Sequence, residues 1–170
     1  MTLYDFRTEY RENPIGLTEK APRFSWKMES EEKDTLQTAY EIKVTDENGN
    51  VVWNSGKKAS DQSVLIPYEG ETLADEMLYK VEVSVADNHG NVESIEGTFE
   101  TGIFDNTEFT AKMITSDFPE EETACPVFGK TFAIDKKVKK ARLYATAHGV
   151  YEVTLNGQTV GDYRMAPGWT

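Results

Sequence analysis

Hydrophobic and polar residues alternate along most of the first hundred positions of this chain, a period of two that is typical of half-buried β-strands. The clearest stretch runs from Tyr79 to Val85 and places four apolar side chains on one face. The predicted strands span residues 3–10, 22–28, 39–44, 51–53, 63–66, 79–85 and 95–101. Convincing helical stripes are absent. About seven short strands in ~100 residues predict an antiparallel β-sandwich.

Turn-forming residues follow two of these strands, those at 39–44 and 79–85. Asn48-Gly49 follows the strand at 39–44, and an Asn-Gly pair favours a tight hairpin. Residues 87–91, with the sequence Asp-Asn-His-Gly-Asn, follow the strand at 79–85 in the same way. Both loops are rich in oxygen ligands, but they lack the distal bidentate Glu and the register of an EF-hand. We therefore interpret both as hairpin turns and not as calcium sites.

One spacing refines the sandwich prediction. Leu73 precedes Tyr79 by six residues, and Tyr79 begins the long alternating strand. Over residues 3–102 this pattern resembles a fibronectin type III domain, where a corner tyrosine buries its ring and bonds a nearby backbone group. We therefore expect structural roles for Leu73 and Tyr79. Trp26 alternates with Phe24 and Met28, which predicts a core position for this side chain as well.

The pattern changes after residue 102. Residues 103–125 are a predicted connector, and strand patterns resume at 128–134, 141–147 and 150–155. Asn156-Gly157 then predicts a hairpin that returns through Val160 to Tyr163. A jelly roll needs about eight strands, and only about four are predicted here. We therefore expect an all-β chain, with a fibronectin-III/immunoglobulin-like antiparallel sandwich at 1–102 and an incomplete, jelly-roll-like β-sandwich at 126–170.

The charge is negative and unevenly distributed. The net charge is −12, and residues 1–102 carry 10 Lys and Arg against 21 Asp and Glu. Phosphate backbones and anionic membranes attract cationic surfaces, so we expect neither nucleic acid nor membrane as a partner. The first residues lack a basic start followed by an apolar stretch, and Cys125 is the single cysteine. Both observations favour a cytoplasmic location without a signal peptide or an internal disulfide.

Candidate catalytic and metal-binding residues are few. Acidic side chains gather at Glu29, Glu31, Glu32 and Asp34, and again at Glu120, Glu121 and Glu122. Paired carboxylates can hydrolyse sugars, but these lie in predicted solvated loops without a His or Arg that would tune a pKa. Cys125, His89 and His148 have no recognisable metal-ligand spacing. The sequence therefore predicts no catalytic residue, no metal and no cofactor.

Two further tryptophans leave an alternative open. Exposed aromatic rings can stack on sugar faces, and Trp53 lies on a short predicted strand that could be an edge. Trp169 belongs to the second, incomplete domain, so its surroundings cannot be predicted from the pattern. A carbohydrate-binding function therefore stays open beside a purely structural one.

Three groups of segments, taken in order, are similar to a known family. They are 7–16 with 22–26, then 36–40 with 52–56, then 141–144 with 151–157 and 167–170. In this order they resemble the N-terminal portion of bacterial α-L-rhamnosidases of glycoside hydrolase family 78. The resemblance implies a fibronectin-III-like sandwich, then a jelly-roll domain, then an (α/α)₆ barrel that holds the catalytic acid and base. It implies inversion at the anomeric carbon. None of those catalytic positions falls within residues 1–170.

These observations lead to two hypotheses about function. The first is that the chain is a non-catalytic N-terminal region that scaffolds a downstream catalytic domain of the same polypeptide. The alternative is a stand-alone carbohydrate-binding or protein-interaction module. Because a partial sandwich leaves strand edges unpaired, we also expect possible self-association through open edges.

Overall fold

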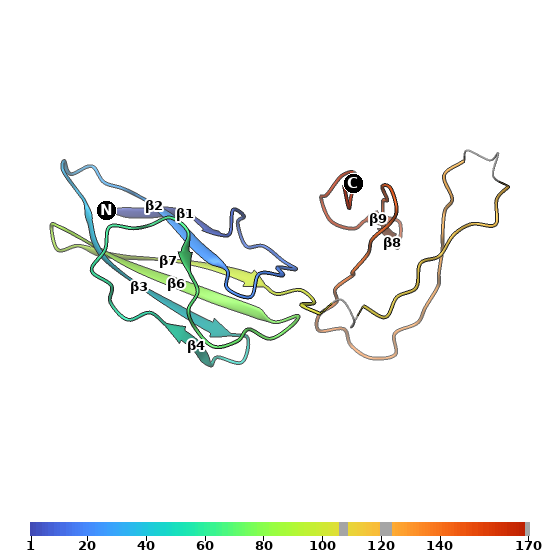
Figure 1. The fold of residues 1–170 in the computed structure, drawn as a ribbon, viewed down its shortest axis with the longest axis horizontal. Coiled ribbons are helices and arrows are strands. Elements are labelled where there is room, and N and C mark those ends of the chain that lie inside the picture. Colours follow the sequence, from blue (N-terminus) through green and yellow to red (C-terminus); the bar gives the residue numbers. More distant parts are fainter. Residues whose placement is uncertain (106–108, 120–123, 169–170) are drawn as a thin grey trace. The chain divides into compact units, whose positions relative to one another are not determined.

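The computed structural model describes residues 1–105, 109–119 and 124–168, and it divides the chain into two units (Figure 1). The first unit is Met1–Thr110 and the second is Ala111–Thr170. The described residues contain strands, turns and extended segments but no helix, which confirms the all-β prediction. Accordingly, none of them belongs to a helix that is long and apolar enough to cross a bilayer.

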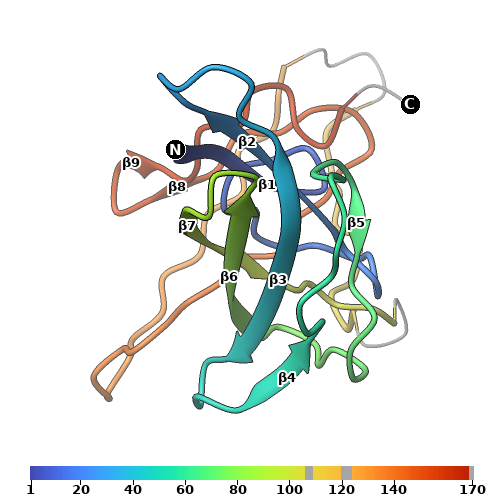
Figure 2. The same cartoon turned by 90° about the vertical axis from the view of Figure 1, so that its left-hand side faces the viewer.

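Seven strands build the first unit. They are β1 (Thr2–Thr8), β2 (Arg23–Glu29), β3 (Gln37–Asp46), β4 (Val51–Asn54), β5 (Ile66–Pro67), β6 (Leu78–Asp87) and β7 (Val92–Glu100). They form a three-stranded sheet in the order β1-β2-β5 and a four-stranded sheet in the order β4-β3-β6-β7. All neighbouring strands in both sheets are antiparallel, and Figure 2 shows β3 beside β6 in the larger sheet. This arrangement is the predicted immunoglobulin-like sandwich.

Aromatic side chains from both sheets fill the space between them. Phe24 of β2 lies at the centre of this core, with its ring centroid 6.1 Å from that of Phe6 and 6.0 Å from that of Phe99. The Phe99 ring in turn stacks on Tyr79 at 5.1 Å. The alternating strand β6 contributes Val81, Val83 and Val85, which are fully buried. Period-two patterning therefore delivers one apolar face from each sheet to a shared core.

The strand predicted at residues 63–66 is shorter and later than expected. β5 contains only Ile66 and Pro67, because Leu65 has a φ of 53° and turns the chain away from an extended course. The Leu65 amide donates to the Ser25 hydroxyl at 2.8 Å in place of a ladder bond. A buried Ile66 and the following proline are still consistent with the apolar pattern of the sequence.

The described part of the second unit contains one regular element, the hairpin of β8 (Thr154–Leu155) and β9 (Gln158–Thr159). Its turn is the predicted Asn156-Gly157, with φ values of 51° and 80°. The strands predicted at 128–134 and 141–147 are wrong, because the described residues there form no ladder. Their apolar side chains, among them Phe128, Phe132 and Leu143, stay exposed. Without a neighbouring strand or a buried face, an alternating pattern does not stabilise a sheet.

Candidate functional site

The first predicted acidic cluster is exposed at the end of β2 and in the loop that follows it. Glu29, Glu31, Glu32 and Asp34 are exposed, and Glu120, Glu121 and Glu122 lie outside the described residues. The exposed Glu32 carboxylate lies 3.3 Å from Nδ1 of His89. Within the described ranges, no three His, Cys, Asp or Glu side chains gather into a metal site; Cys125 and His148 are both exposed. Those of these residues that the structure describes provide no catalytic arrangement.

The two loops with calcium-like sequences use their first carboxylate to close a turn. The Asp46 Oδ1 atom accepts the amides of Asn48 at 2.9 Å and Asn50 at 2.8 Å. In the second loop, the Asp87 Oδ1 atom accepts the amides of His89 at 2.9 Å and Asn91 at 2.8 Å. Hydrogen bonds from Asn50 and Asn48 lower the pKa of Asp46, with Asn50 contributing most. Burial acts to raise the pKa of Asp87, but hydrogen bonds from Asn91 and His89 outweigh it, so this pKa is also lowered.

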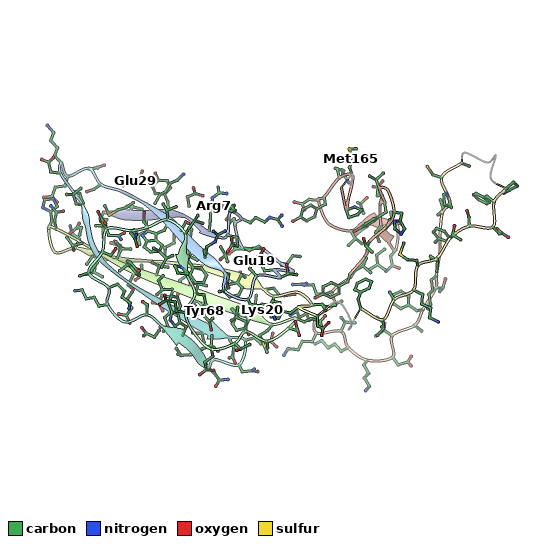
Figure 3. The ribbon with its side chains drawn as sticks, in the orientation of Figure 1. Arg7, Glu19, Lys20, Glu29, Tyr68 and Met165 are labelled. Atoms are coloured by element: carbon green, nitrogen blue, oxygen red, sulfur yellow. The ribbon has the colours of Figure 1, made fainter. Side chains whose placement is uncertain are left out.

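The tryptophans within the described residues do not form a sugar-stacking platform. Trp26 is 1% exposed, and its Nε1 donates to Gln37 at 3.0 Å. Trp53 on the edge strand β4 is half-buried, and its ring centroid lies 5.2 Å from that of Tyr68 and 6.3 Å from that of Phe24. The Tyr68 hydroxyl donates to the Glu71 carbonyl at 2.8 Å, which holds this pair in place; Figure 3 labels Tyr68. Trp169 lies outside the described residues.

Tyr79 joins the core to the loop that precedes it. Its ring is 3% exposed and stacked on Phe99, and its hydroxyl accepts the amide of Ala74 at 2.8 Å. Burial raises the pKa of Tyr79, although the Ala74 amide acts in the opposite direction. Leu73, the residue before Ala74, is 4% exposed and belongs to the same core. This is the geometry expected of a corner tyrosine.

Thr101 binds the other side of the same loop. Its hydroxyl donates to the Ala74 carbonyl at 2.6 Å and accepts the Met77 amide at 2.9 Å. Its own amide donates to the Met77 carbonyl at 3.0 Å. Thr101 is fully buried and follows the last residue of β7. The corner loop is therefore attached both to β6, through Tyr79, and to the segment that leaves β7.

We call residues 101–105 the exit segment, because they carry the chain out of the sandwich. The loop between β1 and β2 also binds the exit segment. The Gly102 amide donates to the Leu17 carbonyl at 2.7 Å, and Leu17 forms a parallel bridge with Thr101. Further along, the Phe104 amide donates to the Asp75 carboxylate at 2.7 Å. Two loops thus bond the exit segment from opposite sides, and the half-buried Phe104 packs against the core.

A polar network on β1 and β2 closes the N-terminal edge. Asp5 lies at the β1 bulge with a φ of 51°, 2.7 Å from both Arg7 and Lys27 (Figure 3 labels Arg7). Both cations lower the pKa of Asp5, and Lys27 has the larger effect. Glu9 accepts three bonds from the Arg23 guanidinium and one from the Arg23 amide, so Arg23 lowers the pKa of Glu9. These groups satisfy one another and leave no acid–base pair for catalysis.

Sequence reasoning located Tyr79, Leu73 and Trp26 but missed the exit segment. Thr101 appeared only as the end of a predicted strand, and Ala74 carried no signal, because its role rests on backbone groups. The one available hint was Leu17, an apolar residue between polar ones that the structure buries beside Thr101. The arrangement as a whole is suited to fixing the course of the chain, and it holds no chemistry of its own.

Comparison with known proteins gives two matches to family models. Residues 3–105 match the model described as Rha78A-like, N-terminal immunoglobulin domain. Residues 136–170 match the model of the α-L-rhamnosidase N-terminal domain. The first match covers more than half of the chain and coincides with the seven-stranded sandwich.

Similar proteins are longer than this chain. An α-L-rhamnosidase of Formosa agariphila is 33% identical over 93% of this chain and 19% of the relative. An α-L-rhamnosidase of Alteromonas sp. (strain LOR) has the same identity and coverage. Among solved structures, the α-L-rhamnosidase of Aspergillus terreus matches 99% of this chain and 20% of its own, with 27% identity and a TM-score of 0.79. The Streptomyces avermitilis α-L-rhamnosidase complexed with L-rhamnose matches 65% and 11%, with 34% identity and a TM-score of 0.60. The chain spans about a fifth of the length of the curated relatives it matches.

Proposed function

The chain belongs to the Rha78A-like N-terminal immunoglobulin domain family, and from this premise we propose that it is the non-catalytic N-terminal region of an α-L-rhamnosidase. In this proposal a downstream (α/α)₆ domain of the same polypeptide hydrolyses terminal α-L-rhamnosides by inversion. The sandwich scaffolds that domain. Its contribution is mechanical: it orders the polypeptide that leads away from β7.

The exit segment is the observation that carries this proposal. A domain that only binds a ligand does not need a rigid departure for its chain. Here, Thr101 and Gly102 are bonded to two different loops, and the Phe104 amide is bonded to Asp75 of the corner loop. Each added constraint removes conformations from the segment that follows, which lowers the entropy lost when a later domain docks. The geometry therefore supports a scaffolding role.

The absence of a built catalytic pair among the described residues fits this role. Inversion requires two carboxyl groups roughly 6.5–9.5 Å apart around a pocket that holds a sugar and a water. Asp5 and Glu9 are each engaged by cations. Their pKa values are lowered, whereas a general acid needs a raised pKa.

The alternative, a stand-alone carbohydrate-binding module, is distinguished by titration. We expect no saturable heat or chemical-shift change when the 170-residue chain is titrated with L-rhamnose and with methyl α-L-rhamnoside, because Trp26 and Trp53 pack into the sandwich. D-Mannose, which has the opposite configuration and a 6-hydroxyl group that L-rhamnose lacks, serves as the control for nonspecific effects. Saturable binding of rhamnose but not of mannose would favour the binding module over the scaffold.

The exposed apolar residues of the second unit need a cover. Val127 is 95% exposed, and Phe132, Ile134 and Tyr163 are more than half exposed. We assign this cover to the further polypeptide that the longer relatives carry, and a second copy of the chain is the competing cover. Multi-angle light scattering of the 170-residue chain and of the full-length protein separates them. Self-association of the chain that disappears in the full-length protein is the expected result.

A further inference from the structure

β7 is the outermost strand of the four-stranded sheet, and only half of its free edge is covered. Residues 13–17 run beside its C-terminal half. There the Asn13 Oδ1 atom accepts the Thr98 amide at 2.8 Å, and the Pro14 carbonyl accepts the Glu100 amide at 2.9 Å. The even-numbered amides of β7 thus point away from β6, and the ladder between β6 and β7 has no register shift. The amides of Val92, Ser94 and Glu96 therefore face the same free edge.

No group among the described residues bonds the amides of Val92, Ser94 or Glu96 on that edge. We call Val92–Glu96 the open edge. A hollow of about 390 Å³ lies beside it, lined by Asp5, Phe6, Glu12, Asn13, Ile95 and Glu96. The half-buried Ile95 offers an apolar contact in this hollow. Room beside unpaired strand groups is what an added strand requires, since neighbouring strands lie only about 4.8 Å apart.

The charges beside the open edge select the partner. Glu93 and Glu96 lie on the strand itself, and Glu12 lines the hollow. Glu96 is paired with Lys80 at 2.7 Å, but Glu93 and Glu12 have no cation within salt-bridge distance among the described residues. A second copy of β7, paired antiparallel, would bring glutamates of both copies together, and like charges across a strand pair are destabilising. Glu93 lies on the same face of β7 as Ile95, whereas Glu96 lies on the other face. An extended segment with Lys or Arg at alternate positions places its cations on one face and is complementary to Glu93 there.

We propose that the open edge is a strand-addition site for an extended polypeptide segment with alternating cationic side chains. Backbone bonds to Val92, Ser94 and Glu96 supply the attachment, and the glutamates supply the preference for cations. The covered half of β7 shows the same edge already accepting a neighbouring segment, residues 13–17, through backbone groups. The Asn13 side chain occupies the next position and marks where the covered part ends. This inference does not depend on the rhamnosidase assignment.

The test uses the 170-residue chain labelled with ¹⁵N and a capped heptapeptide of alternating Lys and Val. We expect saturable shifts at Val92, Ser94 and Glu96, with hydrogen exchange at Ser94 slowed about tenfold. Ser94→Pro removes one outward amide and should abolish binding, because proline is tolerated at a solvent-facing edge position. Ser94→Ala is the matched control: it also loses the 2.7 Å bond to Ser84 but keeps the amide, so it should bind.

Three results would overturn the proposal. The first is the absence of exchange protection in the unsubstituted chain at millimolar peptide, which does not depend on any variant folding. The second is equal binding of an alternating Glu and Val peptide, which would remove the preference for cations. The third is a concentration-dependent shift of the open edge without peptide, which would identify a second copy of the chain as the occupant.

Discussion

Tyr79 and Thr101 bind opposite polar groups of the same residue: the Tyr79 hydroxyl accepts the Ala74 amide at 2.8 Å, and the Thr101 hydroxyl donates to the Ala74 carbonyl at 2.6 Å. One residue belongs to β6 and the other follows β7, so the corner loop connects the core to the exit segment. Loss of either hydroxyl should therefore change the energetic contribution of the other. The first two predictions use this relationship.

Tyr79→Phe keeps the buried ring but leaves the Ala74 amide without its acceptor. Ala74 is exposed and its bond to Tyr79 is only part-buried, so we expect a loss of about 0.5–1.5 kcal/mol in the free energy of unfolding, the net value of a typical hydrogen bond. Tyr79→Ala also removes the ring from the core and should cost more, about 3–5 kcal/mol. Chemical denaturation of the 170-residue chain, followed by tryptophan fluorescence, measures both. A Tyr79→Phe variant as stable as the parent chain would refute the role of the hydroxyl.

Thr101→Val removes the second hydroxyl without changing the shape of the side chain. We expect a cost of about 1–3 kcal/mol, because the Met77 amide and the Ala74 carbonyl both lose a partner. Thr8→Val is the matched control, and we expect it not to lower the free energy of unfolding. The Thr8 hydroxyl is fully buried and has no partner among the described residues, so its removal should be neutral or stabilising.

The double variant Tyr79→Phe with Thr101→Val tests whether the two hydroxyls act together. Residues that share a partner usually show an interaction energy of about 0.5–3 kcal/mol in a double-mutant cycle. We expect a combined cost that differs from the sum by an amount in this range. Strict additivity would mean that the corner loop does not couple β6 to the exit segment.

Gly97→Ala should disturb the contact between β7 and β1. A Cβ atom at Gly97 would lie 2.2 Å from Cδ1 of Phe6, so the ring or the strand has to move. Overpacking of this kind typically costs about 1–3 kcal/mol. Phe6→Leu frees the space, so the cost of Gly97→Ala should shrink in that background. Thermal unfolding measures the four proteins, and an unchanged cost would place the strain elsewhere.

The sequence predicted the sandwich well because each of its long strands buries one face. β6 and β3 alternate cleanly, and their turns carry Asn-Gly or Asp-Asn-His-Gly, so pattern and turn chemistry agree. The strand predictions were wrong in the second unit, where the alternating segments have no neighbouring strand among the described residues to pair with. Residues 128–134 alternate equally well, yet nothing described pairs with them. The strand predicted at 63–66 was wrong for another reason. The positive φ of Leu65 lets its amide bond the Ser25 hydroxyl, and no local sequence signal encodes this contact.

The candidate site was harder to predict than the fold. The exit segment depends on backbone groups of Ala74, Met77 and Leu17, which any residue could supply. Tyr79 was predictable because a corner tyrosine has a fixed spacing from a preceding leucine. Thr101 was not, because a threonine at the end of a strand is common and its partners lie 24 to 27 residues away in the chain.

Alkaline pH should destabilise the sandwich through Tyr68. Burial raises the pKa of Tyr68 to about 12, against about 10 in an unfolded chain. Its stabilising contribution is therefore complete below pH 10 and is lost as the pH rises from about 10 toward 12. Tyr68→Phe should flatten the fall of the unfolding free energy over that range. Tyr10→Phe, at a tyrosine that is 66% exposed, should leave the slope unchanged; equal slopes for both variants would contradict the assignment.

Activity on p-nitrophenyl α-L-rhamnoside, measured for the 170-residue chain beside the full-length protein, tests the central claim most directly. We predict turnover by the full-length protein and none by the chain above a buffer blank. Asp5 and Glu96, two of the three carboxylates that line the hollow beside β7, are already paired with Lys27 and Lys80, which does not suit them to inverting hydrolysis. A circular dichroism spectrum of the chain establishes that it is folded during the assay. Turnover by the chain itself would contradict its non-catalytic role, and a full-length protein inactive on every rhamnoside would contradict the proposed parent activity.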